Sequence, residues 1–108
     1  MERRSYNAGE AIFQAGEPSD FAYLIITGSV EARLANGRSV LLKKGEVFGE
    51  MGLVDQRPRS ATIIAKEYAV CAAYTEAELL SSIREAPDEA ILLIRALIGR
   101  LREANKTI

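Results

Sequence analysis

Glycines and two oppositely charged side chains are concentrated between residues 47 and 62. Gly49 and Gly52 flank the segment that contains Glu50, and Arg59 lies nine residues after that carboxylate. Glycine allows a backbone to approach a ligand closely and leaves amides that can point at an anion. An arginine guanidinium presents a fixed fork of donors that suits phosphate oxygens. The segment therefore predicts an anion-binding site with Arg59 as its charged donor.

Glu50 limits the kind of anion that this site can bind. Its carboxylate would repel a phosphate, so in a phosphate site it needs another partner, and a sugar hydroxyl is a suitable donor. A ligand with a phosphate on one side and a free ribose hydroxyl on the other is a 3′,5′-cyclic nucleotide. The alternative is a structural ion pair between Glu50 and Arg59. Arg57, which precedes Pro58, is interpreted as a solvated loop charge.

Short β-prone runs separated by glycines make up the first two-thirds of the chain. Residues 29–34 alternate between apolar and polar side chains, which is typical of a half-buried antiparallel strand. Asn36-Gly37 then predicts a type I′ hairpin turn before a strand over 39–42. Further strands are expected over 21–27, 61–65 and 68–74. We expect an antiparallel β-roll or jelly roll over about residues 8–74, followed by α-helices.

Two helices are expected in the last third of the chain. Thr75 and Glu78 fit a capping box, which predicts a helix over about 76–85. Pro87 and the acidic residues after it suit the first turn of a second helix, over about 88–105. The apolar face of this second helix is wider than docking onto a sheet requires, so part of it is interpreted as a cover for a ligand or a partner helix. The candidate lid residues are Leu97, Ile98 and Leu101, with Gly99 as a pivot.

Composition argues against several classes of function. The 108 residues include no histidine, a single cysteine (Cys71), 14 basic and 15 acidic side chains. Triads that need imidazole, histidine metal sites and an internal disulfide are therefore excluded. The near-neutral charge argues against nucleic-acid binding, and no apolar run is long enough to span a bilayer. We expect one cytoplasmic domain over residues 1–108, with no enzymatic activity, no cofactor and no binding to nucleic acid or membrane by this chain alone. Cys71 is expected to be a buried small hydrophobe.

Two short stretches also resemble a known family. Phe48-Gly49-Glu50-Met51-Gly52-Leu53, followed by Pro58-Arg59-Ser60-Ala61-Thr62, resembles the phosphate-binding cassette of cyclic nucleotide-binding domains. That family includes regulatory subunits of cAMP-dependent kinase, cyclic-nucleotide-gated channels and CRP-type bacterial activators. The resemblance covers about residues 8–105 and implies a regulatory module whose ligand is cAMP or cGMP.

The resemblance implies a role for individual residues. Glu50 would hold the ribose 2′-hydroxyl and Arg59 the cyclic phosphate, while Gly49 and the amides of Gly52 and Ser60 would complete the anion pocket. Serine at position 60 favours cAMP over cGMP by the same resemblance. The family usually has alanine where this chain has Gly52. The candidate ligand-binding residues are Phe48, Gly49, Glu50, Met51, Gly52, Arg59, Ser60 and Ala61.

Two other classes of function are weighed against a ligand sensor. A domain of the same fold that binds no ligand, and acts as a scaffold or oligomerisation element, would be expected to lose Glu50 or Arg59, and both are present. A cupin-type metalloenzyme would need histidine ligands, which the chain lacks. The expected partners are a cyclic nucleotide, an effector protein or domain of unknown identity, and a second copy that would pair through the last helix.

Overall fold

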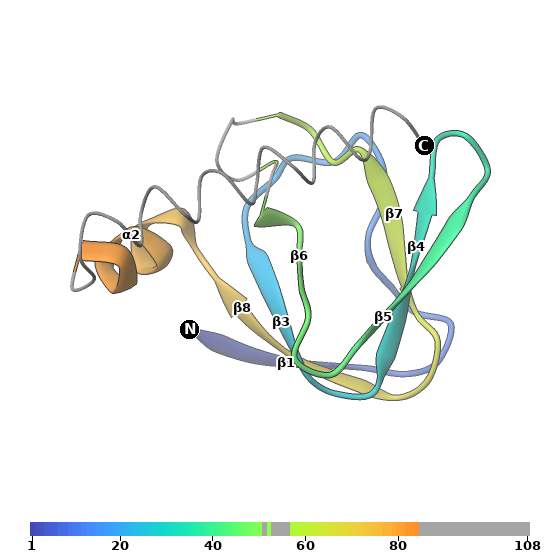
Figure 1. The fold of residues 1–108 in the computed structure, drawn as a ribbon, viewed down its shortest axis with the longest axis horizontal. Coiled ribbons are helices and arrows are strands. Elements are labelled where there is room, and N and C mark those ends of the chain that lie inside the picture. The colour runs from blue at the N-terminus through green and yellow to red at the C-terminus, as the bar shows by residue number, and fades with distance from the viewer. Residues whose placement is uncertain (51, 53–56, 85–108) are drawn as a thin grey trace.

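The described part of the chain forms two antiparallel four-stranded sheets (Figure 1). The computed structural model describes residues 1–50, 52 and 57–84. One sheet has the strand order β1-β8-β3-β6 and the other β2-β7-β4-β5. The elements are β1 (Glu2–Tyr6), β2 (Ala11–Phe13), β3 (Ala22–Thr27), β4 (Ser29–Leu34), β5 (Ser39–Lys43), β6 (Val47–Phe48), β7 (Ala61–Ala65), β8 (Ala69–Tyr74) and α2 (Glu76–Arg84). The predicted fold class, an antiparallel β-roll or jelly roll, is confirmed.

The core lies between the two sheets and is made by alternate residues of the strands. In β7, Ala61, Ile63 and Ala65 are buried, and the two residues between them are less so. Such a period of two is what a strand with one face toward the core produces. The ring of Tyr23 stacks on that of Phe48, with centroids 5.0 Å apart. Other core members are Phe13, Ile25, Val30, Ala32, Ala69, Cys71 and Ala73.

Cys71 is fully buried in β8, as expected. Burial raises the pKa of its thiol to about 11. The group is therefore protonated at neutral pH and behaves as a small apolar side chain.

The hairpin between β4 and β5 forms at the predicted place, but with a different turn. Leu34 N donates to Arg38 O at 2.8 Å and Gly37 N donates to Leu34 O at 3.0 Å, so Ala35, Asn36 and Gly37 form a three-residue loop. Gly37 has a φ of 86°, and Arg38 N donates to Asn36 Oδ1 at 2.9 Å. Three-residue hairpin loops place a left-handed glycine directly after the turn. The predicted two-residue type I′ turn is therefore wrong, because Gly37 follows the central pair of the turn instead of belonging to it.

The other strand boundaries agree closely with the sequence. The strands expected over 29–34 and 61–65 are β4 and β7 without change, and the other three expected strands differ by one residue. However, β1 lies ahead of residue 8, where the roll was expected to begin. It is an edge strand that pairs with β8, and most of its side chains are exposed and polar, so it carries no hydrophobic alternation.

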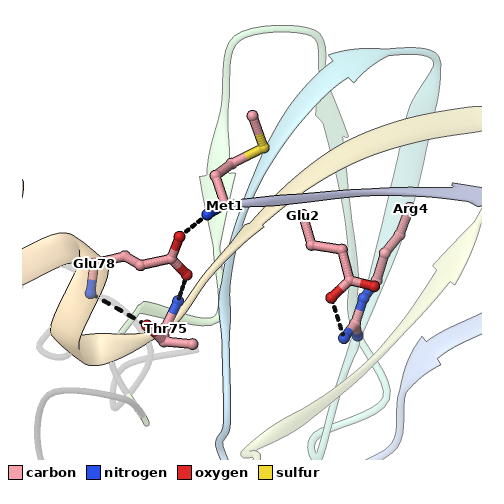
Figure 2. Close-up of polar contacts among 5 residues, drawn as sticks. All are labelled: Met1, Glu2, Arg4, Thr75 and Glu78. Carbon is pink, nitrogen blue, oxygen red and sulfur yellow. Dashed lines mark hydrogen bonds and ion pairs between the residues drawn. The ribbon is translucent and has the colours of Figure 1, made fainter.

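The start of α2 confirms the predicted capping box. Thr75 N donates to Glu78 Oε1 at 3.0 Å, and Glu78 N donates to Thr75 Oγ1 at 3.2 Å. Figure 2 shows this reciprocal pair and the ion pair between the other Glu78 oxygen and the Met1 amino group, which connects β1 to α2. The second expected helix, over 88–105, lies outside the described residues. Within the described part of the chain, no helix is long and apolar enough to cross a membrane.

Candidate ligand-binding site

A cavity of about 320 Å³ lies against the sheet β2-β7-β4-β5. Strand residues such as Ala32 of β4 and Ile63 of β7 form one wall, and the segment from β6 to the start of β7 forms another. Pockets that bind small molecules usually have volumes of roughly 300–1,000 Å³ and a few polar groups in an apolar lining. This cavity fits the lower end of that range.

The predicted ligand-binding residues come together around this cavity. Every one of them that the structure describes lines it: Phe48, Gly49, Glu50, Gly52, Arg59, Ser60 and Ala61. Met51 lies outside the described residues, as do Leu97, Ile98 and Leu101 of the candidate lid and the pivot Gly99. Arg57 is exposed, as expected for a solvated charge. It also lines the cavity, which was not expected.

Arg59 is the buried cation of the site, with only 6% of its surface exposed. Its Nη1 donates to Gly49 O at 2.8 Å and its Nη2 donates to Phe21 O at 2.5 Å. The guanidinium carbon lies 4.0 Å from the centroid of the Phe13 ring. Nε is buried and has no hydrogen-bond partner among the described residues. Because a guanidinium has five N–H donors, the two carbonyls leave donors of this cavity-lining side chain unused.

The surroundings of Arg59 act on its charge in opposite directions. Burial lowers its pKa, whereas Tyr23, Asp20, Glu17 and Glu50 raise it. An arginine in a protein stays protonated, so the protein holds a desolvated positive charge at this place. An anion that reached the unused donors would offset part of that desolvation.

The structure shows a reason for the glycine at position 49 that the sequence did not indicate. Its φ of 80° is in the left-handed region. A Cβ at this position would lie 2.7 Å from Arg59 Nη1 and 3.3 Å from Phe13 Cε2. The glycine thus leaves the space that the Arg59 guanidinium occupies, in addition to any approach to a ligand.

The cavity has a polar side and an apolar side. Glu50, which is partly buried, and Ser60, which is exposed, lie on the same segment as Arg59. The apolar lining includes Leu34, Val40, Leu42 and Val47. Sequence reasoning missed this wall and the contacts of Arg59 with Phe13 and Phe21. The alternation of residues 29–34 does place Ala32 and Leu34 on one face, but nothing local indicates that this face lines a cavity.

Residues 3–86 match the family model described as the cyclic nucleotide-binding domain. The match covers most of the chain, and the chain therefore belongs to the cyclic nucleotide-binding domain family. The resemblance of the sequence to this family is thus confirmed. Within the described residues there is no cluster of histidine, cysteine, aspartate and glutamate that could hold a metal ion.

Individual relatives place this domain in several kinds of protein. The chain is 37% identical, over an alignment of 110 residues, to the Cyclic AMP receptor protein of Thermus thermophilus, covering 97% of this chain and 51% of the relative. It is 40% identical over 68 residues to a cGMP-dependent protein kinase of Eimeria tenella, covering 63% of this chain and 7% of the kinase. The chain thus spans about half the length of the first relative and a small part of the second.

Solved structures of an EAL enzyme show the same fold. Its cAMP-bound form matches with a TM-score of 0.76 and 33% identity, over 98% of this chain and 29% of that chain. Its cGMP-bound form matches with a TM-score of 0.79 and 32% identity, over 98% and 30% of the two chains.

Proposed function

We propose that this chain binds a 3′,5′-cyclic nucleotide in the 320 Å³ cavity and acts as a regulatory sensor without catalysis of its own. The observation that carries the proposal is the position of Arg59, a buried cation that lines the cavity together with the other predicted ligand residues and whose two carbonyl contacts leave guanidinium donors unused. A desolvated guanidinium with unused donors favours an anionic ligand, and phosphate geometry suits it.

Each group of the ligand has a proposed counterpart. The cyclic phosphate would accept from Arg59 and from the backbone amides of Gly52 and Ser60. The ribose 2′-hydroxyl would donate to the carboxylate of Glu50. The purine would lie along the apolar wall, where Val40 and Leu42 can exclude water from its faces.

We further propose that cAMP is preferred over cGMP. The argument is Ser60, because cAMP-responsive bacterial channel domains of this family have serine at this position, whereas many cGMP sites have threonine. The related EAL enzyme has been captured with either nucleotide, so both must be tested side by side.

The signal is proposed to leave the domain through its last segment. In the bound state Leu97, Ile98 and Leu101 would cover the purine, with Gly99 as the pivot. In the free state the same apolar side chains would meet an effector or a second copy. Only an element whose contacts differ between the two states can transmit binding. The effector remains a proposal, because the chain spans about half of the Thermus relative.

Isothermal titration calorimetry of the purified chain tests this function. Titrations with cAMP and cGMP should both give saturable binding, with the lower dissociation constant for cAMP. The matched control is 5′-AMP, which keeps the base and sugar but lacks the cyclic phosphate, and it should bind more weakly. The absence of binding by both cyclic nucleotides would instead favour the scaffold role.

A further inference from the structure

Gly52 differs from the other described glycines. Gly9, Gly16, Gly28, Gly37, Gly45 and Gly49 all have positive φ angles, which explains why each is a glycine. Gly52 has helical backbone and no such angle, so its conformation would accept alanine. The reason for this glycine must therefore be the space around its Cα.

Ser19 fills that space. A Cβ built on Gly52 would collide with Ser19 Oγ, and would lie 3.0 Å from Ser19 Cβ and 3.0 Å from Arg57 O. Two of these three contacts are with one side chain, which comes from the loop between β2 and β3. A methyl group at position 52 therefore requires Ser19 to move.

The position of Ser19 is fixed by a hydrogen bond to the cassette. Its Oγ donates to Arg57 O at 2.6 Å, and Arg57 N in turn donates to Gly52 O at 3.2 Å. Ser19, Gly52 and Arg57 thus form one small cluster, in which the serine contacts both ends of the segment between residues 52 and 57.

The same loop makes further contacts with the residues around Arg59. Gly16 N donates to Arg59 O at 2.8 Å, and Arg59 N donates to Glu17 O at 2.8 Å. Phe21 O accepts from the guanidinium at 2.5 Å. The loop therefore forms hydrogen bonds with the backbone N–H, the backbone carbonyl and the side chain of Arg59. Ser19 adds a hydrogen bond to the carbonyl of Arg57, two residues earlier in the chain.

We propose that Ser19 and Gly52 are a matched pair of positioning residues, in which the missing side chain at 52 admits the serine hydroxyl that holds the Arg57 carbonyl and thereby sets the place of Arg59. The inference rests on the proposed function, since it assigns these residues to ligand affinity. The Ser19 side chain is not proposed to touch the ligand, and the absence of a side chain at Gly52 acts through Ser19, separately from the contact proposed for the Gly52 amide. The pair acts by keeping the cassette in the conformation that binds the ligand. When a smaller fraction of the protein has that conformation, the apparent affinity falls in proportion.

A double-mutant cycle with cAMP as the probe tests the pairing. Ser19→Ala removes one neutral hydrogen bond and should raise the dissociation constant roughly 3- to 10-fold. Gly52→Ala should raise it further, because the methyl group displaces the serine. Ser19→Gly with Gly52→Ala in the same chain should bind better than Gly52→Ala alone and close to Ser19→Gly alone, because the glycine at 19 makes room for the methyl group. Ser5→Ala, an exposed serine on β1, is the matched control and should bind as the wild type.

Thermal unfolding of the same proteins separates positioning from general stability. Variants that remain folded at the titration temperature and still bind cAMP weakly support the proposal. A lowered midpoint with an unchanged dissociation constant would make the pair merely structural and overturn it. So would a double variant that binds no better than Gly52→Ala. If the wild type binds neither cAMP nor cGMP, the proposed function itself fails and this inference fails with it, which is a distinct result from binding without coupling.

Discussion

At the scale of the residue, Arg59 makes contacts within the protein that sequence analysis did not predict, in addition to its proposed contact with a ligand. Its Nη atoms donate to the carbonyls of Gly49 and Phe21, and its plane lies over Phe13. These contacts support the protein itself. The guanidinium donors that these two bonds leave unused support the proposed contact with a phosphate. A variant at this position should therefore change stability as well as binding.

Arg59→Ala is expected to weaken cAMP binding by roughly 2–5 kcal/mol, the usual result of removing one partner of a desolvated charge pair. It should also lower the free energy of unfolding, by about 1–3 kcal/mol, because the partly buried carbonyls of Gly49 and Phe21 lose their donors. Calorimetry and urea denaturation measure the two effects.

Arg38→Ala is the control for Arg59→Ala, since Arg38 is an exposed arginine that does not line the cavity. Its free energy of unfolding should stay within about 0.5 kcal/mol of the wild type, as for most surface substitutions. An Arg59→Ala protein with wild-type affinity would show that the phosphate binds elsewhere. An Arg59→Ala protein with wild-type stability would show that the two carbonyl contacts contribute little.

Glu50 gives a second prediction at this scale. If its carboxylate accepts from the ribose 2′-hydroxyl, 2′-deoxy-cAMP should bind more weakly than cAMP by roughly 1–3 kcal/mol, because the hydrogen bond between this hydroxyl and the partly buried carboxylate is lost. In Glu50→Gln this difference should shrink, since the charged acceptor is gone. Paired titrations of both ligands against both proteins measure it. Equal affinities of the wild type for cAMP and its deoxy analogue would contradict the role.

At the scale of the element, local signals predicted the fold well. The period of two in residues 29–34 gives β4 with its bounds unchanged, because side-chain alternation is a property of the strand itself. The capping box of α2 is equally local, since both of its hydrogen bonds join Thr75 to Glu78. What sequence reasoning missed depends on tertiary contacts. β1 is an edge strand with exposed polar residues, so no hydrophobic pattern marks it.

The candidate site divides in the same way. Gly49, Glu50 and Arg59 lie close together in the sequence, so their types and spacing could be recognised without a structure. Phe13 and Phe21 are distant from Arg59 in the sequence, and only the folded sheets bring them to the guanidinium. The contact of Ser19 with Gly52 was missed for the same reason. The sequence showed only that position 52 has glycine where the family usually has alanine.

The cap of α2 gives a prediction for an element. Thr75→Ala removes the hydroxyl that accepts from Glu78 N and should lower the free energy of unfolding by about 0.5–2 kcal/mol. Thr75→Ser keeps the hydroxyl and is the matched control, with a much smaller loss. Urea denaturation followed by circular dichroism measures both. Equal losses in the two variants would mean that the methyl group of Thr75, and not its hydroxyl, stabilises this end of the helix.

At the scale of the whole molecule, Cys71 can report the global stability of the domain. It is the single cysteine of the chain and is fully buried, and its raised pKa keeps the thiol protonated. Alkylation needs an exposed thiolate, so in the native protein it should follow opening of the core. Iodoacetamide labelling at pH 8 should therefore be slow without ligand. cAMP at about 100 times its dissociation constant should slow the labelling by about 100-fold, because a ligand that binds only the native state lowers the unfolding equilibrium constant by that factor. A labelling rate that cAMP leaves unchanged would mean that Cys71 is reached by local opening unrelated to the site.

The last prediction concerns how the whole molecule responds to its ligand. A helix over 88–105 would have a wider apolar face than docking onto a sheet requires, and Gly99 would weaken it by about 1 kcal/mol relative to alanine. If residues 97–105 cover the purine in the bound state, their amides must exchange more slowly when the nucleotide is present. Hydrogen exchange with and without cAMP should then show added protection in two places, residues 49–60 and residues 97–105. The control is 5′-AMP at the same concentration, which should protect neither as strongly. If protection rises over 49–60 alone, the ligand is held without a lid, and the signal must leave through the cassette and the loop that holds Arg59.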